Sequence, residues 1–319
     1  IIYLGTLILS FAKSFELLFF ARILQGIGCS VCLMGPLVYL AKNSEKKKFS
    51  KYSGIIMGVG GLGALFAFSP FHELTLLYGW QKSFFVFSFL VLAAILIFII
   101  FKFDNKQNKK KNKNRDIGIF IYIFTNKNFL RILPMSIFGY ASFAFLLTLW
   151  GNKFLSIKLN INDKQIALIL MSMALFWTFG SIFFGLVNNK IIKNKTLVIF
   201  SASALIFILL LLSFIKIDNF YFIFSIFSIY GFLGAFTLVI LDHYRCLFDK
   251  DILGKVLTSA NLFNFGGVFF VQWITGLVIE FSSNKERLSV ETGFVISFAL
   301  ISFFLLLSVY FYSKSDEGK

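Results

Sequence analysis

Long apolar segments recur along this chain, and their length constrains the fold more than any other feature. A helix needs about 20 predominantly apolar residues to cross the hydrocarbon core of a bilayer. Because lipid leaves backbone polar groups no outside partner, segments of this length are predicted to be membrane-spanning helices. Nine segments are long enough, and they cover residues 17–41, 52–71, 83–101, 129–149, 166–187, 196–215, 220–241, 256–281 and 294–312.

The first 12 residues are also apolar, but they are too few to cross a bilayer. At ~1.5 Å per residue they cover only part of a ~30 Å core, which is typical of half a helix. Because the chain also begins without Met, we expect it to be truncated at its N-terminus. The sequence therefore predicts an all-α polytopic membrane protein, with nine full transmembrane helices plus one partial helix. A composition that is 58% hydrophobic excludes an ordinary soluble domain.

Lysine and arginine alternate in density between successive loops. Loops of one set, together with the C-terminal tail, hold 22 of these residues, and the other loops hold 8. Because cytoplasmic loops are enriched in Lys and Arg, the first set and the C-terminus are predicted to be cytoplasmic. This distribution also explains the net charge of +16 without nucleic acid as a partner.

The longest polar interruption covers residues 104–116 and contains three consecutive lysines. It predicts a basic cytoplasmic linker between an N-terminal helical part, residues 1–103, and a C-terminal helical half, residues 117–319. Residues 117–124 are apolar but too few to cross the bilayer, so we expect them at the cytoplasmic interface.

Arg22 lies inside the apolar segment 17–41. An ionisable side chain in the hydrocarbon region is costly and usually faces the bundle interior, so Arg22 is a candidate for a functional site. Gln25 shares its helix face, and Gly26 and Gly28 would let a helix or solute approach the backbone closely. The alternative is that Arg22 only extends to the nearer membrane surface.

Several polar residues of the later segments are further candidates. Asn261 and Asn264 are one turn apart, and they are equally compatible with interhelical hydrogen bonds and with a polar cavity. Gln272, about three turns later, is predicted to hydrogen-bond between helices. Trp150 and Asn152 lie at an outer helix end, where Trp150 is typical of an aromatic belt. A polar cluster at the cytoplasmic surface is predicted for Asp242, His243 and Arg245, in preference to a proton relay.

Glycine is unevenly distributed among the segments. The segments that begin at residues 83, 196 and 294 contain no glycine, which is typical of helices that face lipid over much of their surface. The other segments are predicted to pack closely around a centre, and the run with Gly60, Gly61 and Gly63 is the densest of them. A period of three segments indicates a repeated architecture.

These motifs together resemble the major facilitator superfamily of secondary transporters. The sequence Arg22-Ile-Leu-Gln25-Gly26-Ile-Gly28 is similar to the family's fourth-helix motif, which would make residues 1–12 part of helix three. The glycine-rich run from Gly54 to Gly63, followed by Gly79-Trp80-Gln81, is similar to helix five and its exit into helix six. Gln81 stands where family members often have arginine.

The loop after Gly185 resembles the second copy of the family's gate motif, with Lys190 in a basic position. Asn189 replaces the usual acid and Ile192 the usual glycine, which argues against a charge-based latch in this loop. The resemblance implies helices three to six in residues 1–103 and helices seven to twelve in residues 117–319. It also implies a multi-pass protein of the bacterial inner membrane.

The resemblance implies secondary active transport of a small solute by alternating access, and it leaves coupling to a proton or cation open. A drug or metabolite efflux antiporter and a non-transporting membrane sensor are the alternatives. No catalytic motif or phosphate-binding loop is present, so we expect neither an enzyme nor a cofactor or metal. The expected partners are the solute and the lipid bilayer, and the protein is expected to be a monomer.

Overall fold

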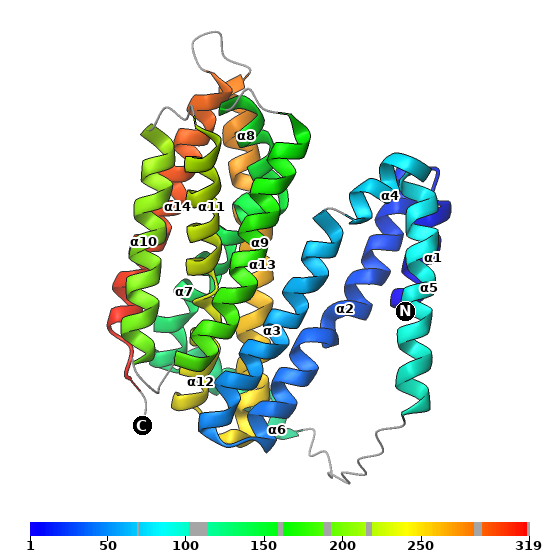
Figure 1. Cartoon of the computed structure of the whole chain (residues 1–319). Coiled ribbons are helices and arrows are strands. Elements are labelled where there is room, and N and C mark those ends of the chain that lie inside the picture. The colour runs from blue at the N-terminus through cyan, green and yellow to red at the C-terminus, as the bar shows by residue number, and fades with distance from the viewer. Residues whose placement is uncertain are drawn as a thin grey trace. The chain divides into compact units, whose positions relative to one another are not determined.

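The computed structural model describes residues 1–68, 70–101, 114–158, 162–187, 193–214, 219–283 and 289–317, and these residues are almost entirely helical (Figure 1). The elements, in chain order, are α1 (Ile2–Phe11), α2 (Phe15–Asn43), α3 (Lys46–Phe68), α4 (Pro70–Tyr78), α5 (Trp80–Ile100), α6 (Asn114–Thr125), α7 (Lys127–Ala144), the π-helical η1 (Phe145–Trp150), α8 (Gly151–Lys158), α9 (Asp163–Val187), α10 (Asn194–Phe214), α11 (Phe220–Gly234), α12 (Thr237–Leu247), α13 (Lys250–Ser283) and α14 (Val290–Ser313).

Eight helical stretches of the described residues are long and apolar enough to cross a membrane. Two of them join successive elements, because α7, η1 and α8 continue from Lys127 to Lys158, and α11 and α12 from Phe220 to Leu247. The remaining six are α2, α5, α9, α10, α13 and α14. The all-helical membrane fold expected from the sequence is confirmed, and α1 is a short apolar helix as expected for residues 1–12.

The segment predicted over residues 52–71 differs from the helices that form there. Helix α3 begins at Lys46, because the basic residues before Tyr52 join the helix, and it ends at Phe68. A second helix, α4, then begins at Pro70. Proline is tolerated in the first turn of a helix but disrupts a helix interior, which accounts for a new helix at this position.

The chain divides into two compact units. The first contains residues 1–37 and 66–116, and the second contains residues 38–65 and 117–319. Residues 104–113 of the predicted linker lie outside the described residues, and α6 includes the rest of it. The predicted division into parts 1–103 and 117–319 stays a prediction.

In the first unit, α1 packs against α5 and α2. The Gln81 side chain donates a hydrogen bond of 2.8 Å to the carbonyl of Ala12, the residue that follows α1. A Cβ added to Gly5 would lie 3.0 Å from the carbonyl oxygen of Ala21, so α1 and α2 approach each other closely. Gln81, at the position where members of the resembled family often have arginine, therefore holds the end of α1.

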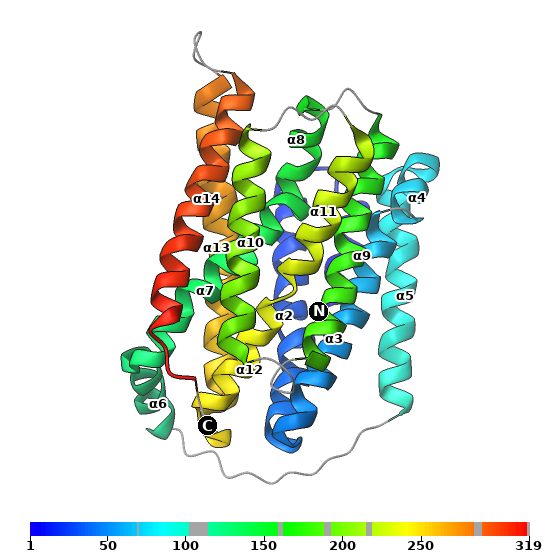
Figure 2. The same cartoon turned by 60° about the vertical axis from the view of Figure 1, so that its left-hand side comes forward.

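The second unit is a bundle in which α9 lies beside α11 and α10 beside α14 (Figures 1 and 2). Glycines allow the first of these pairs to approach closely. A Cβ on Gly180 would lie 2.5 Å from the carbonyl oxygen of Phe232, and one on Gly231 would overlap that of Met173. The hydroxyl of Ser228 also donates to that of Ser172 over 3.1 Å. The predicted use of glycine for close helix packing is therefore supported at this pair.

Two irregular turns interrupt long spans of the second unit. In η1 the N–H of Gly151 donates to the carbonyl of Leu146, five residues earlier, and a Cβ at position 151 would overlap that oxygen. Between α11 and α12, the N–H groups of Ala235 and Phe236 donate to carbonyls only three residues earlier. Both irregularities change the direction of side chains that follow them.

Candidate functional site

Arg22 and Gln25 form a short hydrogen-bonded chain in the first unit. Arg22 Nη1 donates to Gln25 Oε1 over 3.2 Å, and Gln25 Nε2 donates to the hydroxyl of Thr6 over 3.1 Å. The guanidinium carbon of Arg22 also lies 5.6 Å from the ring centroid of Phe84. Helices α1, α2 and α5 together fix the direction of this guanidinium.

The Arg22 side chain keeps donors for a further partner. A guanidinium carries five N–H donors, and Gln25 accepts from one of its nitrogens. None of the three ion pairs among the described residues involves Arg22. The group is therefore a cation within a membrane-spanning helix that could bind a polar or anionic group.

The glycines that accompany Arg22 have different surroundings. A Cβ on Gly28 would overlap Ile2, so this glycine allows α1 to lie against α2. A Cβ on Gly26 would meet no other described residue within 4 Å. Gly28 therefore serves helix packing, and Gly26 leaves the helix face open beside Gln25.

Asn264 and Gln272 both reach from α13 to a neighbouring helix. With its amide oriented to suit its neighbours, Asn264 donates to the carbonyl oxygens of Ser136 on α7 and Ala260 on its own helix, at 3.1 Å each. Gln272 Nε2 donates to the hydroxyl of Thr148 in η1 over 2.7 Å. Both amides thus hydrogen-bond within the bundle, while Asn261, one turn before Asn264, is half-buried.

Trp150 and Asn152 differ in their surroundings although they lie close in sequence. The Trp150 indole packs against α13 and α14, since a Cβ on Gly276 would lie 3.3 Å from its Cζ2 and its ring centroid is 6.0 Å from that of Phe294. The Asn152 side chain is exposed. The structure therefore places Trp150 in a packing contact and leaves Asn152 accessible.

A cavity of about 490 Å³ lies among α7, α13 and α14. Gly266 and Gly267 line it together with apolar side chains such as Phe138 and Phe304. Neither Asn261 nor Asn264 is among its lining residues. The cavity beside the two glycines is therefore apolar, in contrast to the polar cavity considered for the asparagine pair.

The predicted glycines of α3 and α9 meet in the second unit. A Cβ on Gly185 would lie 2.7 Å from the Ser50 carbonyl oxygen and 3.1 Å from Gly54 Cα, and one on Gly61 would overlap the Thr178 side chain. We call the contact between Ser50–Gly61 and Thr178–Gly185 the glycine seam. Added Cβ atoms on Gly60 and Gly63 would meet no described neighbour within 4 Å. Lys190, the basic residue of the predicted gate loop, lies outside the described residues.

The cytoplasmic polar cluster predicted at residues 242–245 lies at the end of the bundle that carries the C-terminus. Asp242, His243 and Arg245 are all buried, at 3%, 0% and 4% exposure. Tyr244, between them, is also buried and its hydroxyl lies 3.2 Å from that of Ser136. These side chains are therefore parts of the bundle interior rather than of its surface.

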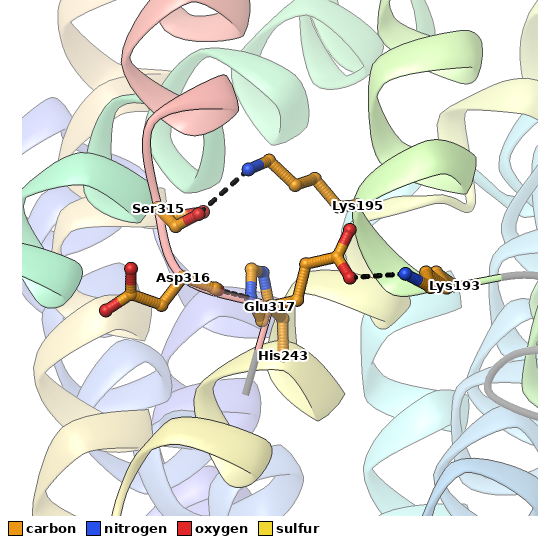
Figure 3. Close-up of polar contacts among 6 residues, drawn as sticks. All are labelled: Lys193, Lys195, His243, Ser315, Asp316 and Glu317. Carbon is orange, nitrogen blue, oxygen red and sulfur yellow. Dashed lines mark hydrogen bonds and ion pairs between the residues drawn. The ribbon is translucent and has the colours of Figure 1, made fainter. Parts of the chain in front are cut away.

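His243 is held by the segment that follows α14. Its Nδ1 lies 2.7 Å from the hydroxyl of Tyr312, and its Nε2 lies 2.7 Å from the carbonyl oxygen of Asp316. Because a carbonyl can only accept, Nε2 carries the proton, and in the neutral ring Nδ1 accepts from Tyr312. Figure 3 shows His243 facing this segment.

Residues 314–317, which we call the C-terminal strap, bond to three helices of the second unit. Lys195 donates to the Ser315 carbonyl over 2.9 Å, and Lys193 pairs with Glu317 over 2.7 Å (Figure 3). The hydrogen bond from Lys193 lowers the pKa of Glu317 below its usual value. On the α7 side, Arg131 donates to the Lys314 carbonyl over 2.7 Å. The strap thereby ties the chain around Lys193 and Lys195 to α7 and α12.

Arg245 bonds to a different element. Its Nη2 donates to the carbonyl oxygen of Ser44 over 2.7 Å, and its guanidinium carbon lies 4.6 Å from the ring centroid of Phe49. Sequence reasoning did not identify Ser44, Phe49 or the strap as partners of the polar cluster. Neither a backbone carbonyl nor a distant aromatic residue leaves a local sequence signal that could have indicated these contacts.

Comparison with known proteins gives one family. The model described as Major Facilitator Superfamily matches residues 1–271. No curated protein matches the chain.

Proposed function

This chain belongs to the Major Facilitator Superfamily, a family of secondary transporters, and we propose that it moves a small solute across the membrane by alternating access. The observation that carries the proposal is the family match over most of the chain. Members of this superfamily are generally not enzymes, and the described residues contain no group of three or more side chains that could hold a metal ion.

We extend the proposal to topology. Nine spanning helices plus the partial helix α1 would place residues 1–103 in the N-terminal half, 104–116 in a basic linker and 117–319 in the C-terminal half. The loops with 22 Lys and Arg residues, against 8 on the other side, support a cytoplasmic C-terminus. The inner membrane of a bacterial cell is the proposed location.

Arg22 and Gln25 are the proposed solute or coupling-ion contacts of the N-terminal half. The fixed direction of the guanidinium and its remaining donors support this role. Asn261 and Asn152 are the proposed contacts of the C-terminal half. Asn264 and Trp150, which the sequence also offered as contacts, have packing contacts that support a structural role, and the hydrogen bond from Gln272 to Thr148 supports the interhelical role expected for Gln272.

The test is a solute panel in cells that produce the protein as its gene encodes it. Uptake and efflux of labelled sugars, amino acids, organic acids and cationic drugs are compared with those of cells that carry an Arg22→Ala variant. We expect one solute class to move at a rate that Arg22→Ala reduces. Movement only out of the cell would indicate the efflux antiporter, and a signal response without movement of any solute would indicate the sensor and contradict transport.

A further inference from the structure

Arg245 makes a directional contact between residues 38–65 and the rest of the second unit. Residue Ser44 follows the last residue of α2, and its N–H donates to the Leu40 carbonyl over 2.9 Å. Its own carbonyl is at the C-terminal end of α2, where helix carbonyls lack intrahelical partners and carry partial negative charge. A cation that donates to this oxygen provides both the missing hydrogen bond and a positive charge. Arg245 does this from α12.

The aromatic contact of Arg245 adds to this hydrogen bond. Phe49 is fully buried, and its ring faces the guanidinium at 4.6 Å. A guanidinium stacks on an aromatic face more favourably than a lysine ammonium, and the interaction strengthens when both groups are desolvated. Arg245 therefore contacts the residue that follows α2 and a residue in the first turn of α3.

Glycines of the same segment and of α13 make further close contacts. The glycine seam brings α3 and α9 together through the backbone at Gly54 and Gly185 and through the Thr178 side chain at Gly61, and the buried hydroxyls of Ser53 and Ser181 have no hydrogen-bond partner among the described residues. Near α13, a Cβ on Gly254 would lie 2.9 Å from Val38 Cγ1. Contacts of this kind depend on shape, so they separate without the loss of a directional bond.

We propose that Arg245 is a gate-positioning residue that holds the cytoplasmic side of the transporter closed through Ser44 and Phe49. This inference rests on the proposed function, in which residues 38–65 belong to the N-terminal half and α9, α12 and α13 to the C-terminal half. In alternating access, opening toward the cytoplasm requires these elements to separate. Each transport cycle then breaks and re-forms the bonds of Arg245.

The experiment measures accessibility of the glycine seam without any solute. Ser181→Cys is the reporter, because Ser181 is 1% exposed and its hydroxyl has no hydrogen bond to lose. It is placed in the full chain after Cys29, Cys32 and Cys246 are changed to Ser. Labelling by a membrane-impermeant maleimide is then timed in inside-out vesicles and in intact cells.

We expect Arg245→Gln to raise the labelling rate in inside-out vesicles by roughly tenfold, the effect of losing a charge-assisted hydrogen bond. Phe49→Leu, which keeps the bond to Ser44, is expected to raise it less. Arg131→Gln is the matched control, because Arg131 also donates to a backbone carbonyl over 2.7 Å but bonds to the strap. Its labelling rate is expected to equal that of the parent.

An unchanged labelling rate in both Arg245→Gln and Phe49→Leu, with elution of each variant as a single folded species, would overturn the gate role. Labelling from the outside in intact cells would also overturn it. The labelling assay contains no solute, so it is independent of the solute panel. A tenfold increase in labelling rate, together with no transport of any solute in the panel, would reject the proposed transport but still support the role of Arg245 in closing the cytoplasmic side.

Discussion

At the scale of single residues, side-chain amides have different roles in different parts of this protein. Gln25 orients a cation, whereas Gln272 and Asn264 hydrogen-bond between parts of the bundle. The sequence predicted the packing role of Gln272 but left the Asn pair undecided. Spacing along a helix shows which side chains share a face, but it does not show which carbonyl on a neighbouring helix lies opposite.

Replacing Arg22 with Lys is expected to reduce transport by about tenfold. A lysine ammonium keeps the charge, but it cannot hold the forked geometry in which one nitrogen bonds to Gln25 while others remain for the solute. The measurement is the initial transport rate at matched protein levels in the membrane. Arg131→Lys, at a half-buried site that bonds to the C-terminal strap, is the control. Normal transport by Arg22→Lys would show that the Arg22 side chain only reaches the membrane surface.

Replacing Gly185 with Ala is expected to destabilise the protein by about 1 to 3 kcal/mol, the usual cost of overpacking. The added methyl would press on the backbone of Ser50 and Gly54, which cannot move aside as a flexible side chain could. Thermal unfolding in detergent measures the change. Gly63→Ala is the matched control, since its Cβ would meet no described neighbour, and an equal midpoint for both variants would contradict close packing at the glycine seam.

At the scale of elements, hydropathy located the spans but not their irregularities. Eight of the nine long apolar segments coincide with helical stretches that are long and apolar enough to cross a membrane, whereas segment 52–71 covers parts of α3 and α4. The break between α11 and α12 and the π-helical turn η1 were not predicted. Hydropathy depends on which residues are present, whereas these turns depend on which carbonyl each N–H reaches.

The C-terminal strap is the element that sequence reasoning missed altogether. The segment 314–317 is short and polar, and the sequence predicted only a cytoplasmic tail there. Three of the bonds that hold these residues to the bundle are made by their backbone carbonyls, which every residue possesses. A polar tail that is bound in this way has the same composition as one that is not.

The ion pair of the strap predicts a pH dependence. Lys193 lowers the pKa of Glu317 in the folded protein, so the pair stabilises the strap above the unfolded pKa of that glutamate. This contribution is lost as the pH falls through the lowered folded pKa. The ¹³C carboxyl shift of Glu317, assigned by comparison with Glu317→Gln, should therefore titrate below an ordinary glutamate.

The Lys193→Gln variant provides the matched control for this titration. Without the ammonium, the midpoint of Glu317 should rise toward that of a glutamate in an unfolded peptide. Identical midpoints with and without Lys193 would show that the ion pair does not form in solution.

At the scale of the whole molecule, the uneven distribution of basic residues is the main determinant of orientation. The family relationship gives the class of fold, whereas the side of the membrane on which each loop lies is predicted from the charges. Bonds at the C-terminal end of the second unit, from the strap to Arg245, are all expected on the same side. The inference about Arg245 depends on this orientation.

Single cysteines at Lys250 and Lys164 test the orientation directly. Both side chains are exposed. Lys250 is the first residue of α13, and Lys164 is the second residue of α9. We expect an impermeant maleimide to label Lys164→Cys in intact cells and Lys250→Cys only after the membrane is opened. Labelling of both cysteines from the outside would show that the predicted topology is wrong. Labelling of only Lys250→Cys in intact cells would show that the protein has the opposite orientation in the membrane.

The π-helical turn also affects how this protein should be aligned with others. A π turn accommodates one residue more than an α turn, so every side chain from Gly151 to Lys158 is rotated by about 100° from the position it would have on an uninterrupted α-helix. A homologue with a regular helix here would match only if one position between 145 and 150 were left unpaired. An alignment without that gap would equate buried Leu155 with a residue that lies where exposed Ser156 lies here, and it would assign substitutions in α8 to the wrong surface.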